Sequence, residues 1–196
     1  MSPVEYAPIV AVAFAVPQFL PQIRRVVRSR DARGVSWAWA ALTSVNNAAW
    51  FAYFLGSGYA TALVPAASAS ALAGVLALAL ARRRSPPRRA SGVALWASLL
   101  VAGFAFGGSA GLGSLLTAAF LVQVSPSIWT AYRTPHPTGI SRGTWLLVLG
   151  ELACWFCYGL YRSDVRLLVL GTSGIIASVL MLARTLRIPF ALEPAR

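Results

Sequence analysis

The feature that most constrains this chain is an internal repeat. The stretch from Pro21 to Tyr53 recurs from Pro126 to Tyr158 at a constant offset and without a gap. The matched residues are Gln18 with Gln123, Pro21 with Pro126, Ile23 with Ile128, Arg28 with Arg133, Gly34 with Gly139, Ser36 with Ser141, Ala48 with Ala153, Trp50 with Trp155, Phe51 with Phe156 and Tyr53 with Tyr158. An offset kept over this length indicates a duplicated structural unit.

The composition indicates that this chain is solvated by lipid. Of its 196 residues, 58% are hydrophobic and 11% are charged, whereas about a quarter of the residues of a soluble domain are charged. The net charge of +12 comes from arginine, because the chain contains no lysine. The arginines lie at the ends of apolar runs rather than along one polar face, which argues against a nucleic-acid partner.

The apolar runs divide the chain into membrane-crossing segments, each close to the roughly 20 residues that span a bilayer. They cover residues 6–27, 36–55, 59–81, 92–109, 112–132, 141–161 and 165–186. The sequence therefore predicts an all-α membrane protein with seven transmembrane helices, two parallel three-helix bundles joined by a linking helix. Residues 1–81 form the first bundle, 82–111 the basic linker and linking helix, 112–187 the second bundle, and 188–196 a C-terminal tail.

The placement of arginine predicts the orientation in the membrane. If the loop after the first helix is cytoplasmic, every arginine falls on the cytoplasmic side except Arg162 and Arg166. Such a bias is typical of bacterial inner-membrane proteins and puts the N-terminus outside and the C-terminus in the cytoplasm. The unpaired fourth crossing makes the two bundles parallel, so that both arginine-rich turns face the cytoplasm, in agreement with the charge distribution.

Prolines inside the predicted helices mark candidate hinges. A proline removes one backbone donor and frees the carbonyl four residues earlier, and in lipid that group needs another partner. Glutamines next to the prolines are candidate partners, and each proline is interpreted either as a hinge or as a static kink. The residues concerned are Gln18, Pro21, Gln22, Pro65, Gln123 and Pro126.

Glu151 is the only acidic residue within an apolar run. A bare carboxylate in lipid costs about 2.5 kcal/mol or more, so we expect Glu151 to face the bundle interior, to be protonated, or to meet a partner. It lies one turn before Trp155 and matches Asn46 at the repeat offset. Asn46, Asn47 and Trp50 are therefore expected to lie opposite Glu151 and Trp155 as a pseudo-symmetric pair.

Several chemistries fit this group of residues. A tryptophan ring beside amide groups suits a sugar, because the ring stacks on C–H faces and the amides meet hydroxyls. A carboxylate beside tryptophan equally suits a cationic solute or a transported proton. Glu151 could instead bond to a neighbouring helix, and Trp50 and Trp155 could serve as packing residues or interfacial anchors.

Cys154 and Cys157 form a C-W-F-C pattern inside an apolar run. A redox or metal pair is one interpretation, but we expect two packed small residues, because no second ligand pair exists and the only histidine, His136, falls in a loop. No metal and no cofactor are expected. An enzyme is not expected either, since the apolar runs contain no acid–base pair and no nucleophile with a base.

Three motifs carry a resemblance to a known family. The first copy contains Pro21-Gln22, Gly34-Val35-Ser36 and Trp50-x-x-Tyr53, and the second contains Pro126, Gly139-Ile140-Ser141 and Trp155-x-x-Tyr158 at the same spacing. With these motifs the chain resembles the PQ-loop family, and more narrowly its SWEET and SemiSWEET branch, over the first three and last three helices. The resemblance implies passive sugar transport by alternating access, with the solute between the bundles.

The resemblance also implies site residues. In that family a tryptophan and an asparagine from each bundle shape the sugar pocket. Trp50 and Trp155 match the tryptophan, and the asparagine positions correspond to Ala66 and Gly171. This sequence departs from the family at those two positions, and Ser127 stands at the second-copy position of Gln22.

We therefore expect a transporter of a small polar solute, in the first place a sugar, embedded in the lipid bilayer. The alternative is a transporter of an amino acid or another small solute, coupled to protons through Glu151 as in other PQ-loop branches. A non-transporting receptor on the same scaffold, as in the KDEL-receptor branch, is a different class. The sequence leaves open the substrate, the coupling, the direction of transport and whether the chain forms a homo-oligomer.

Overall fold

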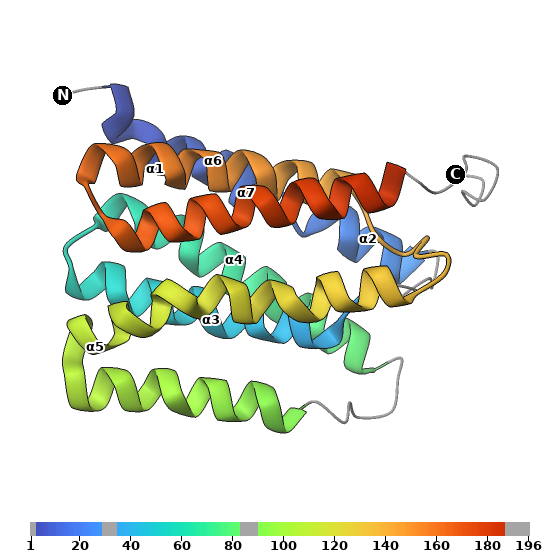
Figure 1. Cartoon of the computed structure of the whole chain (residues 1–196), viewed down its shortest axis with the longest axis horizontal. Coiled ribbons are helices and arrows are strands. Elements are labelled where there is room, and N and C mark those ends of the chain that lie inside the picture. The colour runs from blue at the N-terminus through green and yellow to red at the C-terminus, as the bar shows by residue number, and fades with distance from the viewer. Residues whose placement is uncertain (1–2, 29–34, 83–89, 187–196) are drawn as a thin grey trace.

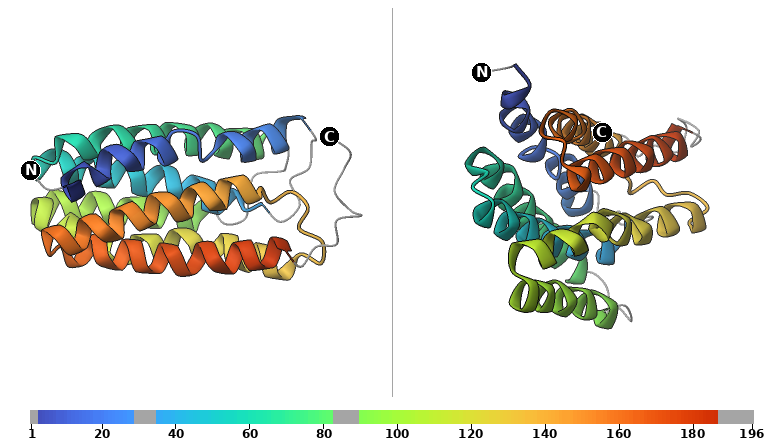
Figure 2. Two further views of the ribbon diagram at one scale, coloured as in Figure 1. Left: turned by 90° about the horizontal axis from the view of Figure 1, so that it is seen from above. Right: turned by 60° about the vertical axis from the view of Figure 1, so that its left-hand side comes forward.

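The computed structural model describes residues 3–28, 35–82 and 90–186, and all regular structure in this part of the chain is helical. The elements are η1 (Pro3–Tyr6), α1 (Ala7–Ala15), α2 (Leu20–Arg28), α3 (Trp37–Gly56), α4 (Ala60–Ala81), α5 (Ala90–Arg133), α6 (Arg142–Arg162) and α7 (Val165–Leu186). The helices run side by side along one long axis (Figures 1 and 2). The expected basic turn at Arg30, Arg33 and Gly34, most of the basic linker and the tail lie outside the described residues.

Five helical segments in the described part of the chain are long and apolar enough to cross a membrane. They are Ala7–Arg28, Ala60–Ala81, Ala90–Arg133, Arg142–Arg162 and Val165–Leu186. The α3 helix has 20 residues but falls outside this set, because Thr43, Ser44, Asn46 and Asn47 lower its hydropathy. The chain therefore has the architecture of a helical, multi-pass membrane protein.

The first predicted helix, over 6–27, is interrupted at its prolines, where the sequence predicted a hinge or a kink. It divides into α1 and α2 around Pro17. Pro21 has no N–H to offer the carbonyl of Pro17, and the Leu20 N–H donates to that carbonyl instead, at 3.0 Å. The side-chain amide of Gln18 donates to the Ala15 carbonyl at 3.2 Å. Gln18 thus satisfies a backbone group at the break, as expected from its position.

The other two candidate hinge prolines do not interrupt the helical segments that contain them. Pro65 belongs to α4 and Pro126 to α5. A hinge or kink was predicted at Pro65, but α4 runs as one continuous helix from Ala60 to Ala81.

Gly108 turns α5 back on itself. Its backbone has φ 56° and ψ −149°, a conformation that only glycine adopts at little cost. The two halves of α5 run antiparallel, and the first half lies at the edge of the bundle (Figures 1 and 2). The bend at this one residue therefore separates the two helical segments, which correspond to the predicted runs 92–109 and 112–132.

Helix packing follows the sequence repeat. In the first copy α4 contacts both α1 and α3, and in the second copy α7 contacts both α5 and α6. Among the described residues, the backbones of α1 and α3 are not adjacent, and neither are those of α5 and α6. Across the copies, α1 packs on α6 and α3 packs on α5. Each contact in one copy thus has its counterpart in the other.

The serines of the two Gly-x-Ser motifs begin the second helix of each copy. Ser36 Oγ accepts the Trp39 N–H at 3.2 Å, and Ser141 Oγ accepts the Thr144 N–H at 3.3 Å. A hydroxyl at this position satisfies a backbone donor that the helix itself leaves unpaired. The same residue type therefore starts α3 and α6 at matched positions.

Candidate solute cavity

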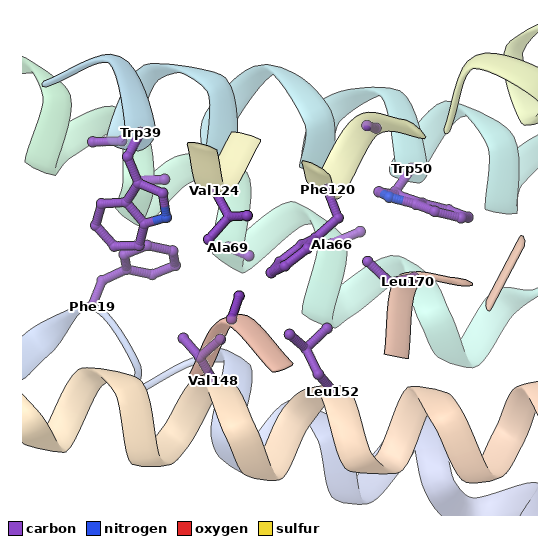
Figure 3. Packing of buried hydrophobic residues seen from close by; sticks show 14 of the residues in the cluster. Phe19, Trp39, Trp50, Ala66, Ala69, Phe120, Val124, Val148, Leu152 and Leu170 are labelled. Atoms are coloured by element: carbon purple, nitrogen blue, oxygen red, sulfur yellow. The ribbon is translucent and has the colours of Figure 1, made fainter. Parts of the chain in front are cut away.

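A cavity of about 50 Å³ lies between the two copies of the repeat. Its polar wall consists of Gln18, Thr43, Asn47, Gln123 and Glu151. Its apolar wall includes Val148 and Leu152 of α6, which point toward Phe120 of α5 (Figure 3). Ligand pockets for small molecules measure about 300–1,000 Å³, so this cavity has room for only a few water molecules.

A stack of three aromatic rings closes the cavity toward the end that carries the N-terminus. The Phe54 ring lies between Trp50, with centroids 5.3 Å apart, and Trp155, with centroids 5.4 Å apart. All three side chains are buried. Trp50 and Trp155 therefore point into the bundle rather than toward lipid, and they meet through Phe54.

A second aromatic group closes the cavity toward the opposite end. Trp39 lies 5.6 Å from Trp145 and 6.1 Å from Phe19 between ring centroids. Figure 3 shows Phe19 and Trp39 at one side of the labelled cluster and Trp50 at the other. Sequence reasoning missed Phe19, Trp39 and Trp145. The two tryptophans do not match at the repeat offset, but their place near the start of both second helices is a usable signal.

Glu151 faces the cavity and has partners for both of its oxygens. The Gln18 side-chain amide donates to Oε2 at 2.7 Å, and the Trp155 indole N–H donates to Oε1 at 3.3 Å. The residue is 8% exposed. The carboxyl group therefore lies inside the bundle and joins the two copies, because Gln18 belongs to the first copy and Glu151 to the second.

Asn46 is buried behind the cavity wall. Its amide nitrogen donates to the Ala119 carbonyl at 2.7 Å and to the Gln123 Oε1 at 3.1 Å. Its Oδ1 accepts the Trp96 indole N–H at 2.7 Å. The cavity wall itself contains the neighbouring Asn47, whose amide donates to the Thr43 carbonyl at 2.9 Å.

The two polar contacts are images of each other under the repeat. Gln18 matches Gln123, and Glu151 matches Asn46. The contact between Gln18 and Glu151 therefore corresponds to the contact between Gln123 and Asn46. Both cross from one copy to the other, but only one contains a carboxyl group.

Gln22 of the PQ motif lies outside the cavity and holds the turn before α6. Its amide nitrogen donates to the Gly139 carbonyl at 2.7 Å, and its Oε1 accepts the Ser141 N–H at 2.9 Å. The Arg25 guanidinium donates to the Thr138 carbonyl at 2.7 Å. The α2 helix of the first copy is thereby fixed to the Gly-x-Ser motif of the second.

The two positions that correspond to the family's asparagines lie in different surroundings. Ala66 lines the cavity. Gly171 does not, and a β-carbon added there would lie 2.6 Å from the Phe156 Cβ and 2.7 Å from its Cα. Gly171 therefore permits the close approach of α7 to α6, and the neighbouring Leu170 contributes to the cavity wall.

The cysteines are apart from this site. Cys154 and Cys157 are free thiols, half-buried and exposed respectively. Within residues 3–28, 35–82 and 90–186, no group of three or more His, Cys, Asp or Glu side chains could hold a metal ion.

Compared with known proteins, the chain matches no protein-family model and no curated protein.

Proposed function

We propose that this protein is a membrane transporter of the SWEET type within the PQ-loop family, and that it moves a small polar solute, in the first place a sugar, by alternating access. The observation that carries the proposal is the closed cavity between two sequence-related halves. Polar groups from matched positions of both halves surround it, and aromatic rings close it at both ends. Parallel repeats around a central site suit this mechanism.

The proposed architecture has seven crossings, two parallel three-helix bundles and a linking helix. The bend at Gly108 supports counting α5 as two crossings, the linking helix and the first helix of the second bundle. The α3 helix supplies the remaining crossing, since its length fits a bilayer. With the arginine-rich turns in the cytoplasm, the N-terminus is outside and the chain resides in the inner membrane.

Alternating access requires each aromatic closure to open in turn. At the N-terminal end, Phe54 of the first copy would separate from Trp155 of the second. At the opposite end, Trp39 of the first copy would separate from Trp145 of the second. The break at Pro17 and Pro21 is the proposed hinge, because backbone there is already held outside the regular helical ladder.

A sugar fits the chemistry of the cavity wall. The faces of Trp50 and Trp155 offer apolar surface near the amides of Gln18, Asn47 and Gln123. Sugars present apolar C–H faces and hydroxyl groups, so both kinds of surface are used at once.

The test is solute counterflow in proteoliposomes with a panel of labelled sugars and amino acids. We expect wild-type protein to exchange a sugar, Trp155→Ala to lose the exchange, and Glu151→Gln to retain it. Trp129→Ala is the matched control, because Trp129 is 52% exposed and remote from the cavity wall. Equal exchange by wild type and Trp155→Ala would refute the assignment of the cavity as the solute site.

The second candidate is a cationic or proton-coupled solute, and the observation that favours it is Glu151. This buried carboxyl group touches the cavity and the indole of Trp155, a pairing that suits a cation. Uptake of an amino acid that requires Glu151 or follows a pH gradient would support this candidate. If folded protein exchanges no solute of the panel, a receptor on the same scaffold becomes the better assignment.

A further inference from the structure

A second hollow of about 660 Å³ lies apart from the cavity, where the α6–α7 turn approaches α3 and α5. We call it the vestibule. It is lined by Tyr53, Tyr59, Ser114, Thr117, Arg162 and the segment 163–166. The α6–α7 turn, the α3–α4 turn and the bend of α5 all lie at the end of the bundle that carries the N-terminus (Figure 1).

Two arginine side chains of the second copy line the vestibule and contact tyrosines of both copies. Arg166 Nη1 donates to the Tyr53 hydroxyl at 3.2 Å, and its guanidinium carbon lies 5.6 Å from the Tyr53 ring centroid. The Arg162 guanidinium carbon lies 5.2 Å from the ring centroid of Tyr59 and 5.9 Å from that of Tyr158. These contacts engage few of the five N–H donors that each guanidinium carries.

The acidic residue of the vestibule, Asp164, has one carboxylate oxygen occupied by a backbone donor. Asp164 Oδ1 accepts the backbone N–H of Arg166 at 2.9 Å, at the start of α7. The hydroxyls of Ser114 and Thr117 donate to carbonyls of their own helix, those of Ala110 and Gly113, at 3.0 and 3.2 Å. The cationic donors that line the vestibule are those of the two guanidinium groups.

We propose that the vestibule is a binding site for a phosphate group, held by Arg162 and Arg166. A guanidinium binds oxyanions through parallel N–H donors. One guanidinium group can donate to both oxygens of a carboxylate. A phosphate has more oxygens and can accept from two guanidinium groups at once. The phosphate belongs either to a soluble solute or to a lipid headgroup. The assignment is independent of the solute that crosses through the central cavity.

The vestibule site adjoins the aromatic stack that closes the cavity. The Tyr53 ring lies 5.6 Å from the Trp50 ring, and the Tyr59 ring lies 6.1 Å from the Phe54 ring, between centroids. A phosphate bound by the arginines would therefore lie one side chain away from that stack.

The test measures the electrostatic field inside the vestibule by cysteine labelling. Ser114→Cys is introduced with Cys154→Ala and Cys157→Ala, and the purified protein is labelled in a phosphate-free neutral detergent. Methanethiosulfonates carrying a sulfonate or a trimethylammonium group are compared. Ser57→Cys is the matched control, because Ser57 is also exposed and lies at the same end, outside the vestibule.

We expect the ratio of anionic to cationic labelling rates to be on the order of tenfold higher at Ser114→Cys than at Ser57→Cys at low ionic strength. Adding Arg162→Gln and Arg166→Gln should lower the ratio to that of the control. Arg162→Gln alone should lower the labelling ratio partly. Because Arg162 is exposed, we expect this substitution to change the stability of the fold little. Inorganic phosphate should slow labelling at Ser114→Cys and leave Ser57→Cys unchanged, with chloride at equal ionic strength as reference.

A second arm identifies the source of the phosphate group. The same variants are labelled in nanodiscs of zwitterionic phosphatidylcholine, with and without phosphatidylglycerol, and with no added phosphate. Protection by inorganic phosphate supports a soluble ligand, and protection by phosphatidylglycerol alone supports a lipid headgroup. If neither protects, or if the labelling ratios at the two positions are equal, the vestibule is not a phosphate site.

Discussion

The first helices of the two copies start from matched sequences and differ in shape. Pro21 and Pro126 occupy the same position of the repeat, but the first copy has Pro17 where the second has Val122. The first copy divides into α1 and α2, whereas α5 continues through Pro126. A single proline is thus accommodated within a packed helix, and a second proline one turn earlier interrupts it.

The polar contacts between the copies differ as well. Each copy contributes a glutamine to the second helix of the other, but Gln18 donates to Glu151 in one contact, whereas Gln123 accepts from Asn46 in the other. Gln22 clamps the turn before α6, and the shorter Ser127 stands at its matched position. The copies therefore share a scaffold, while in the described part of the chain the carboxyl group and the glutamine clamp occur once each. Substitutions at matched positions can test this difference.

The largest effect is expected at the third helices, with Gly171→Val. Its β-carbon would lie within 2.6–2.8 Å of Phe156 backbone and Cβ atoms, so α6 and α7 would have to separate. Overpacking of this kind costs about 3 kcal/mol or more when backbone must move. We expect a lower midpoint of thermal unfolding in detergent, together with low yield of folded protein.

The matched control is Ala66→Val in the first copy. Its added methyl groups would enter the cavity, so unfolding should change by less than about 1 kcal/mol while solute exchange falls. Equal losses of stability at both positions would show that α4 and α7 are packed alike, contrary to the surroundings seen here.

The next largest effect on stability is expected at the matched polar residues of the second helices. Here Asn46→Asp adds a carboxyl group to the first copy, and Glu151→Gln removes the one in the second copy. An aspartate in place of Asn46 loses the donor to the Ala119 carbonyl and to Gln123. Acceptors would then face one another in a buried site, at a cost of about 2–3 kcal/mol. Glu151→Gln keeps one acceptor oxygen for the Trp155 indole, and Gln18 can turn its amide to accept from the new NH2 group, so this variant should lose less stability. Thermal unfolding of both variants, measured at one pH, compares them directly.

Much of the fold was predictable from the sequence because it depends on local and periodic signals. The helices α6 and α7 begin and end within a residue of the predicted runs, since Ser141 marks one start and a short polar turn separates the two. For the first helix, a hinge or a kink was predicted, but the full division into α1 and α2 was not. The sequence shows Pro17 and Pro21, but whether a helix kinks or divides depends on which backbone groups find partners, such as the Ala15 carbonyl with Gln18.

The candidate site was predictable where both copies carried the same signal. Trp50 and Trp155 were found through the repeat, and Glu151 was found as the only acidic residue within an apolar run; all three line the cavity. Phe54 was missed, because the second copy has Gly159 at that position. Its place one turn after Trp50 on α3 was the available signal, but the stacking of Phe54 on Trp155 depends on how the copies pack.

The smallest of these effects is expected at the PQ position, with Gln22→Ala against Ser127→Ala. Removing the Gln22 side chain leaves the Gly139 carbonyl and the Ser141 N–H without that partner. The loss should be about 1–2 kcal/mol, and proteolysis in the 134–141 turn should become faster. Gln22→Glu should behave like Gln22→Ala, since an ionised carboxylate accepts from Ser141 but cannot donate to Gly139.

Ser127→Ala removes only a short hydroxyl, so it should leave both stability and proteolysis close to wild type. If Ser127→Ala lowers stability and accelerates proteolysis as much as Gln22→Ala does, the clamp would be present in both copies, and the two copies would not differ in this respect. If instead Gln22→Ala alone accelerates proteolysis and also slows solute exchange, the turn before α6 moves together with α2. The interrupted helix of the first copy would then act on the second copy through one side chain.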